Sequence, residues 1–264
     1  MKRFLLPLLL ATTLPAHQAL AEPLTPTRYS DFSTYTLALS WQNGFCQSMS
    51  ERGRKMPDEC KLTEGNQQRP LLTVHGLWPS LPRSIASRGV DNRRWMRFGC
   101  ATRPEPNFPE ARGNKCSLPN PGLSPAITQK LAETMPGASG RSCLERYEYA
   151  KHGVCFGFNP NDYFATMARL SQQVNASPLG QWLAAHDGQK VSRADFNNVL
   201  ADSFGKASLK AVKLTCHGNP SYLTEMQMVI DAKSINEPLS ADSLVSQAHP
   251  GNCPKQFVLD AAGH

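Results

Sequence analysis

The sequence has 264 residues, of which 40% are hydrophobic and 19% are charged, and its formal net charge is +7 at pH 7. This length can bury one sizeable core without division into further domains. The positive charge fits either a solubility surplus or attraction to a polyanion such as nucleic acid, and charge alone does not decide between them. Beyond the N-terminus no stretch approaches the ~20 apolar residues of a membrane span, which argues against a membrane-spanning protein.

Residues 1–21 read as a secretory signal peptide. A positive MKR start precedes the short apolar run FLLPLLLATTLP, and the small residues Ala19 and Ala21 mark a cleavage site. Removal of this leader takes Lys2 and Arg3 with it, so the net charge falls by two from +7. We therefore expect an exported protein, with the periplasm or another secreted destination as the alternatives, and a mature domain over 22–264.

Two strands are expected near the start of the mature domain. TYTLALSW (34–41) alternates apolar and polar residues, and LLTVHGLW (71–78) begins with a β-rich apolar run. The segment between them contains several glycines and reads as a loop that Cys46 and Cys60 could clip. Residues 79–123 are rich in proline and show little periodicity, which predicts a long ordered surface segment.

Helices are expected in the middle of the chain and strands at its end. Ser124 can cap a helix that begins at Pro125, and Ser192 with Asp195 resembles a capping box. Helices are predicted over 124–137, 142–153, 159–174 and 192–204. Strands are predicted over 209–216, 222–231 and 255–260, the first two as a hairpin. The pattern indicates a single α+β domain with helices and strands segregated.

All of the cysteines, 8 in number, lie after the leader. An even number in an exported chain favours disulfides over a metal cluster. No CxxC pair is present to support a zinc or redox site, although a metal site stays the alternative. The pairing of the cysteines does not follow from the sequence alone.

A charged and aromatic cluster lies in RYEYAKHGVC (146–155). On a helix, Glu148 and His152 share one face, and Lys151 lies one step round from it. Tyr147 and Lys151 form a second pair at the same spacing. An ordinary solvated face of ion pairs is the alternative interpretation. The flanking cysteines and the two tyrosines instead favour a helix that is held by disulfides and a site that is partly enclosed.

The segment VHGLWP (74–79) carries a second candidate histidine. A structural histidine is the simpler interpretation of His75, because it follows an apolar run. However, Gly76 allows another segment or a ligand to approach the backbone closely. Trp78 offers a flat face for a base or sugar. Neither feature is decisive alone.

Together, HGLWP and the E-x-x-K-H-G-x-C run resemble the two signature segments of the ribonuclease T2 family, the secreted acid ribonucleases. Their order and separation also fit, LSWQNGFC (39–46) resembles the first core strand of the family, and the likeness extends from about Tyr35 to Cys253. The resemblance implies a central antiparallel sheet with helices packed on it, stapled by disulfides. It also implies an endoribonuclease that cleaves single-stranded RNA without a metal or other cofactor.

The chemistry of RNA cleavage explains the residue types. When the 2′-hydroxyl attacks the adjacent phosphorus, a base must take its proton and an acid must protonate the departing 5′-oxygen. Imidazole suits both roles because its unperturbed pKa is about 6.5. By resemblance, His75 is the general acid and His152 the general base, while Glu148 and Lys151 stabilise the transition state. A 2′,3′-cyclic phosphate and then a 3′-phosphate are the expected products, and DNA, which lacks the nucleophile, should not be cleaved.

Two positions depart from the family pattern. Tyr147 stands where the family commonly has a histidine, and its neutral hydroxyl should bind phosphate more weakly. Tyr147 and Trp78 are the expected substrate-binding residues. Ser80 stands where base-selective members often carry an acidic residue that contacts the base edge, so we expect little base specificity.

The resemblance also implies a disulfide pattern. One pair would tie the helix of the site to the segment before it, one would be local, and one would join the C-terminal strands. The implied pairs are Cys46–Cys60, Cys100–Cys143, Cys116–Cys155 and Cys216–Cys253.

Two other classes stay open. A catalytically weak RNA-binding protein on the same fold is favoured only by Tyr147. A metallophosphoesterase would require a cluster of His and Asp ligands, which the sequence does not display. A group of arginines after HGLWP forms either a solvated loop or a track for the RNA backbone. These are Arg83, Arg88, Arg93, Arg94 and Arg97. RNA is the expected partner, and a monomer that does not engage a membrane is the expected state.

Overall fold

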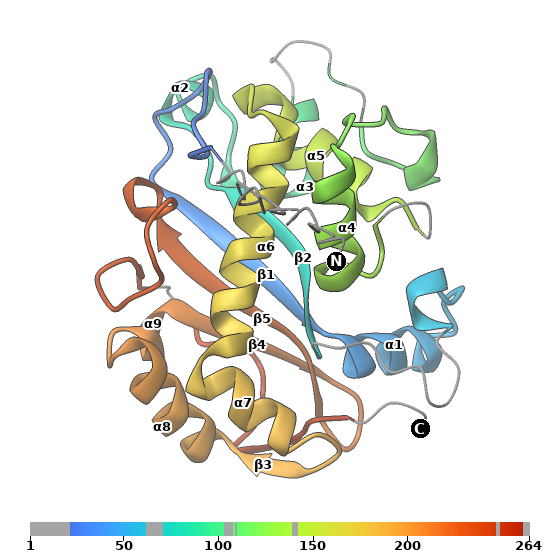
Figure 1. Ribbon diagram of the computed structural model, residues 1–264, viewed down its shortest axis with the longest axis vertical. Helices are drawn as coiled ribbons and strands as arrows, with labels where there is room; N and C mark the ends of the chain where they lie inside the picture. Colours follow the sequence, from blue (N-terminus) through green and yellow to red (C-terminus); the bar gives the residue numbers. More distant parts are fainter. Residues whose placement is uncertain are drawn as a thin grey trace, which may run out of the picture.

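The computed structural model describes residues 22–61, 71–102, 108, 110–138, 142–246 and 249–260. The expected signal peptide (1–21) lies outside the described residues. Within them, a 6-stranded sheet runs through the molecule, with helices on its faces and at its ends (Figure 1). None of the helices in these ranges combines the length and the apolar composition of a membrane span.

The sheet has an antiparallel centre in which β1 lies between β2 and β5. Its strands are β1 (Thr34–Trp41), β2 (Leu72–Pro79), β3 (Lys190–Ser192), β4 (Val212–His217), β5 (Tyr222–Asp231) and β6 (Gln256–Val258). The expected hairpin of β4 and β5 is confirmed. The sheet is mixed rather than wholly antiparallel, because β6 joins β5 in the parallel direction.

Side-chain caps begin several of the helices. The helices are α1 (Gln42–Glu51), α2 (Arg83–Ala86), α3 (Asn92–Phe98), α4 (Pro125–Thr134), α5 (Leu144–His152), α6 (Pro160–Ala176), α7 (Pro178–Ala185), α8 (Arg193–Phe204) and α9 (Ser208–Ala211). Ser124 and Ser192 accept backbone N–H groups at the starts of α4 and α8, as the sequence predicts. The predicted helices α4, α5, α6 and α8 are confirmed, whereas α7 carried no strong signal in the sequence.

The helix α6 fixes the strand that carries His75. It crosses one face of the central strands and contacts β2, while α5 lies beside the same strand (Figure 1). On α6, the Tyr163 hydroxyl donates a 2.6 Å hydrogen bond to the Leu77 carbonyl of β2. Tyr163 is fully buried, so this bond ties the helix to β2 in a site shielded from water.

The segment after β1 is a helix and not the expected loop. Gly44 lies inside α1, where glycine is normally unfavourable. At Gly44 the helix approaches β5 so closely that no side chain fits, since a Cβ there would lie 1.9 Å from the Leu223 carbonyl oxygen. The glycine that suggests a loop in the sequence is therefore a packing requirement of the helix.

The proline-rich segment 79–123 also contains more regular structure than its sequence predicts. Asp91 caps α3 by accepting the Arg94 N–H at 2.7 Å. Trp95 on this helix is buried at 5% exposure and anchors it to the core. The described part of this segment therefore has regular structure. It contains the short helices α2 and α3 and the 3₁₀ turns η2 (Gly99–Ala101) and η3 (Lys115–Ser117).

Two of the implied disulfides are wrong. The structure pairs Cys46–Cys60, Cys100–Cys155, Cys116–Cys143 and Cys216–Cys253. The local pair and the C-terminal pair are as expected. The implied pairs Cys100–Cys143 and Cys116–Cys155 exchange partners.

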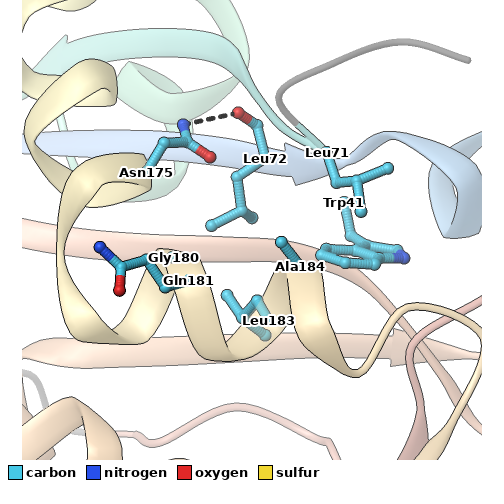
Figure 2. A pocket seen from close by; sticks show the side chains of 8 residues that line it. All are labelled: Trp41, Leu71, Leu72, Asn175, Gly180, Gln181, Leu183 and Ala184. Carbon is cyan, nitrogen blue, oxygen red and sulfur yellow. Dashed lines mark hydrogen bonds between the residues drawn. The ribbon is translucent and has the colours of Figure 1, made fainter.

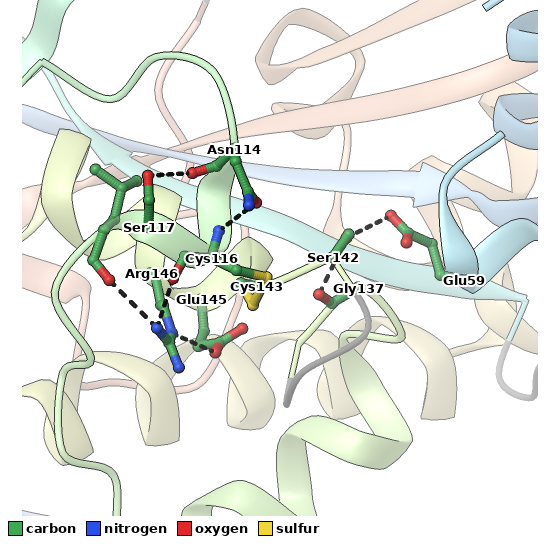
Figure 3. Close-up of a disulfide and its surroundings, with 10 residues drawn as sticks. Glu59, Asn114, Cys116, Ser117, Gly137, Ser142, Cys143, Glu145 and Arg146 are labelled. Atoms are coloured by element: carbon green, nitrogen blue, oxygen red, sulfur yellow. Dashed lines mark hydrogen bonds and ion pairs between the residues drawn. A yellow bond between two sulfur atoms is a disulfide. The ribbon is translucent and has the colours of Figure 1, made fainter. Parts of the chain in front are cut away.

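The position of α5 explains the exchange. Cys143 is the N-cap of this helix and Cys155 follows its C-terminus, so the nine-residue helix separates them by about 13 Å. Each cysteine pairs with the segment that lies beside its own end of the helix. Figure 3 shows Cys116, held in η3 by the Asn114 side chain, next to the start of α5. As a result α5 is covalently fixed at both ends.

We expect Gly44→Ala to lower the free energy of unfolding by about 1–3 kcal/mol, because an added methyl group collides with the backbone of β5. Urea-induced unfolding measures this difference. The control is Ser50→Ala on the exposed face of the same helix, which should stay within about 0.5 kcal/mol of the wild type. Equal stability of the two variants would contradict the packing of α1 on β5.

Candidate active site

The site forms where α5 meets β2, at Glu148 and Gly76. A Cβ at Gly76 would lie 2.1 Å from Glu148 Oε2 and 2.3 Å from Trp78 Nε1. Glycine is therefore required for the helix to bring its carboxylate onto the strand. The Trp78 indole donates a 2.8 Å hydrogen bond to the same Glu148 oxygen. The close approach expected at Gly76 is that of a buried carboxylate.

Both candidate histidines face this carboxylate. His75 Nε2 lies 3.8 Å from Glu148 Oε1, and His152 Nε2 lies 4.0 Å from Glu148 Oε2. The Trp78 ring is 5.3 Å from the His75 ring and 5.5 Å from the His152 ring, measured between centroids. Thus two segments far apart in the sequence place their imidazoles around one carboxylate and one indole.

The two histidines differ in exposure and in charge environment. The His152 side chain is only 9% exposed, and the His75 side chain is 35% exposed. Burial, with the positive charges of Lys151 and His75, holds the pKa of His152 well below its usual value. Burial also raises the pKa of Glu148, and the charge of His75 and the Trp78 hydrogen bond offset only part of that effect.

His75 has a second carboxylate partner that sequence reasoning missed. Its Nδ1 lies 2.7 Å from Glu225 Oε2 on β5. Burial by itself lowers the pKa of His75, but the hydrogen bond with Glu225 and the negative charges of Glu148 and Glu225 outweigh burial and raise it. The only signal in the sequence is that Glu225 lies on a predicted strand, and a strand assignment does not identify a partner 150 positions away.

Two lysines flank Tyr147. Lys151 Nζ donates a 3.3 Å hydrogen bond to the Tyr147 hydroxyl. Lys151 and Lys115 each place Nζ 5.4 Å from the centroid of the Tyr147 ring. Lys115 precedes Cys116 in η3, and the Cys116–Cys143 disulfide holds it against the start of α5. Lys115 is thus a further cation of the site that the sequence did not indicate.

A cavity of about 250 Å³ opens beside His75. Its lining includes Ser40, Phe45, Lys115 and Pro136. A separate cavity of about 180 Å³ lies between the ends of β1 and β2 and the helix α7, lined by Trp41, Asn175 and their neighbours (Figure 2). Its lining residues in the described chain carry no ionisable side chain, whereas Glu59, His75 and Lys115 line the first cavity.

The arginines that follow HGLWP are surface residues. The five arginines are exposed on α2, α3 and the turns beside them, rather than on one irregular loop: Arg83, Arg88, Arg93, Arg94 and Arg97. Among the described residues, no group of three or more His, Cys, Asp or Glu side chains is placed to hold a metal ion.

Known proteins are similar to this chain over most of its length. The model of the Ribonuclease T2 family matches residues 32–239. Ribonuclease I of Escherichia coli (strain K12) is 59% identical over 259 residues, which cover 97% of both chains. A probable ribonuclease of Haemophilus influenzae is 29% identical over 163 residues, 59% of this chain and 50% of that protein.

Solved structures share the fold at low sequence identity. The SF11-RNase of Nicotiana alata superposes with a TM-score of 0.56 at 18% identity, covering 87% of this chain and 100% of that one. Ribonuclease MC1 from bitter gourd seeds gives 0.52 at 19% identity, covering 86% of this chain and 100% of that one. The family match and the 59% identity agree with the signature segments, so the chain belongs to the Ribonuclease T2 family and is an endoribonuclease.

Proposed function

We propose that this endoribonuclease cleaves single-stranded RNA by metal-independent transphosphorylation. The 2′-oxygen forms a bond to phosphorus while the bond from phosphorus to the 5′-oxygen breaks. The product is a 2′,3′-cyclic phosphate that water later opens to a 3′-phosphate. The main support is that two imidazoles flank one buried carboxylate and that their environments move the two pKa values in opposite directions.

His152 is the proposed general base. A base must be unprotonated before the reaction, and the lowered pKa of His152 keeps its imidazole neutral at neutral pH. His75 is the proposed general acid. Its raised pKa favours the protonated ring, which can give a proton to the departing 5′-oxygen. Each transfer contributes about 10²–10⁴-fold to the rate.

Glu148 and Lys151 are proposed to stabilise the transition state. Negative charge builds on the non-bridging phosphate oxygens, where a fixed cation such as Lys151 is most effective. Glu148 Oε1 is buried and has no hydrogen-bond partner in the described part of the chain. It is therefore able to accept a hydrogen bond from a protonated phosphate oxygen while Trp78 holds the other carboxylate oxygen.

Substrate binding is proposed at Tyr147 and Trp78. Two ammonium groups lie 5.4 Å from the centroid of the Tyr147 ring, which suits a site for a phosphate of the RNA backbone. Low base specificity is supported by the contacts of Ser80. Its hydroxyl accepts the backbone N–H groups of Ser33 and Thr34 at 3.2 Å and is engaged there rather than with a base.

We also propose export to the periplasm after cleavage of the signal peptide, as a monomer of one domain over 22–264. Four disulfides in the described chain support an oxidising compartment. RNA is the proposed substrate, whereas DNA and membranes are not proposed partners.

Incubation with RNA in EDTA is expected to yield 2′,3′-cyclic phosphate ends, because no step of the scheme requires a metal. The same strand with 2′-deoxy sugars should stay intact, since it lacks the attacking hydroxyl. Mass spectrometry of the fragments reads both results. Loss of cleavage in EDTA would instead indicate a metallophosphoesterase, and binding without cleavage would indicate an RNA-binding protein.

A substrate with a good leaving group separates the acid from the base. With RNA, His75→Ala and His152→Ala should each lower kcat by about 10²–10⁴-fold. With uridine 3′-(4-nitrophenyl phosphate), His75→Ala should recover most of the wild-type rate, because nitrophenolate leaves without a proton. His152→Ala should stay slow.

The exposed His249→Ala is the matched control for these variants and should behave as wild type with both substrates. Recovery by His152→Ala in place of His75→Ala would reverse the two roles.

The pH dependence of kcat/KM follows from the two pKa directions. Activity is lost on the acid side when His152 becomes protonated, and its lowered pKa moves that limb to lower pH. Activity is lost on the alkaline side when His75 loses its proton, and its raised pKa moves that limb to higher pH. We expect a broad plateau around the unperturbed imidazole pKa of about 6.5 in a dinucleotide assay, and a sharp maximum well below that pH would contradict this assignment.

A further inference from the structure

Glu225 is a charged side chain that the fold places behind His75. Its Oε2 lies 2.7 Å from His75 Nδ1. Its other oxygen, Oε1, accepts a 2.6 Å hydrogen bond from Gln227 Nε2 on the same strand. The Glu225 side chain is 19% exposed, so this chain of contacts is largely shielded from water.

The orientation of His75 depends on an irregularity in β2. Ala38 of β1 pairs with Gly76 on one side and with Gln227 on the other, so Gly76, Gln227 and Glu225 share a face. In a regular strand, His75 would point to the opposite face, because it is adjacent to Gly76. However, Leu39 pairs with Val74, which leaves His75 as the extra residue of a β-bulge. The bulge turns its ring toward Glu225.

A second bulge lies beside Glu225. Thr215 of β4 pairs with Glu225 and Cys216 pairs with Leu223, which leaves Thr224 without a partner on β4. Bulges of this kind re-aim side chains next to active sites. The two members of the contact thus lie on non-adjacent strands, each at or next to an interruption of the regular pairing.

The contact has a chemical consequence for His75. A carboxylate at Nδ1 requires that this nitrogen carry a proton, so in the neutral ring Nε2 is the unprotonated nitrogen. In the charged ring, Nε2 carries the proton that can be transferred. Nε2 is also the nitrogen that lies 3.8 Å from Glu148 Oε1. Glu225 therefore holds the ring with its reactive nitrogen toward the rest of the site.

We propose that Glu225 is the positioning residue of His75, which fixes the direction of Nε2 and stabilises the imidazolium, while Gln227 holds the carboxylate in place. This inference rests on the proposed function, since it concerns the group that we assign as the general acid. Glu225 itself is not proposed to touch the substrate.

Other charged groups also act on this pair. Glu148 and His152 face His75 from α5, and the positive charge of Lys115 on η3 lowers the pKa of His75. Lys213 on β4 acts on Glu225. Burial by itself raises the pKa of Glu225, but the hydrogen bond and charge of His75 outweigh burial and lower it, so the contact favours an ionised Glu225. Glu148 does not duplicate this role, because it faces the other nitrogen of His75 beyond hydrogen-bond distance.

Glu225→Gln tests the inference, because it removes the charge and keeps the shape. We expect kcat on RNA to fall about 10–100-fold, a part of the contribution of a general acid. The alkaline limb of the pH profile should move to lower pH. An NMR titration of the His75 ring in ¹⁵N-histidine-labelled protein, without substrate, should show a lowered His75 pKa. Gln227→Ala should also lower the pKa of His75, by a smaller amount.

Glu237→Gln is the matched control, because it removes the same charge at an exposed position outside the site. It should leave both the pH profile and the His75 titration unchanged. An equal loss of activity at all pH values in Glu225→Gln, with the His75 titration unmoved, would mean a purely structural role and overturn the inference. Absence of cyclic phosphate ends in the wild type would reject the proposed function instead, while the NMR titration would still report on Glu225.

Discussion

Burial of one carboxylate, that of Glu148, is the constraint on which the rest of the site depends. The residue is 1% exposed, and a buried charge is costly unless hydrogen bonds or opposite charges compensate it. Trp78 supplies a hydrogen bond, and the two imidazoles face its two oxygens. This arrangement exists only because Gly76 has no side chain, since a Cβ would occupy the position of the carboxylate. The contact between α5 and β2 therefore sets the geometry of the site.

The surrounding fold keeps this contact rigid. Disulfides hold α5 at both ends, through Cys116–Cys143 and Cys100–Cys155. On the other side, Tyr163 of α6 binds the backbone of β2 two residues beyond His75. The groups proposed to act on one phosphodiester would benefit from such fixed placement, because little reorganisation is then needed during the reaction.

The same fold gives two identical side chains different properties. His152 is enclosed and lies beside the cation Lys151, so burial and charge act together to lower its pKa. His75 is more exposed and contacts two carboxylates, which outweigh the effect of burial and raise its pKa. Divergent pKa values in one site are the usual basis for assigning an acid and a base, and they support the proposed roles of these histidines.

Periodicity, caps and short motifs are local patterns, and they predicted the family, the central strands, the β4–β5 hairpin, four of the helices and the residues of the two signature segments. Only the tertiary structure decided the partners of Cys100 and Cys116, the helix around Gly44, and the places of Lys115 and Glu225 beside the site. These features depend on which distant segments meet. The β-bulge at His75 also changes the face of the sheet to which its side chain points. A one-residue shift of this kind cannot be recognised from the composition or the spacing of residues.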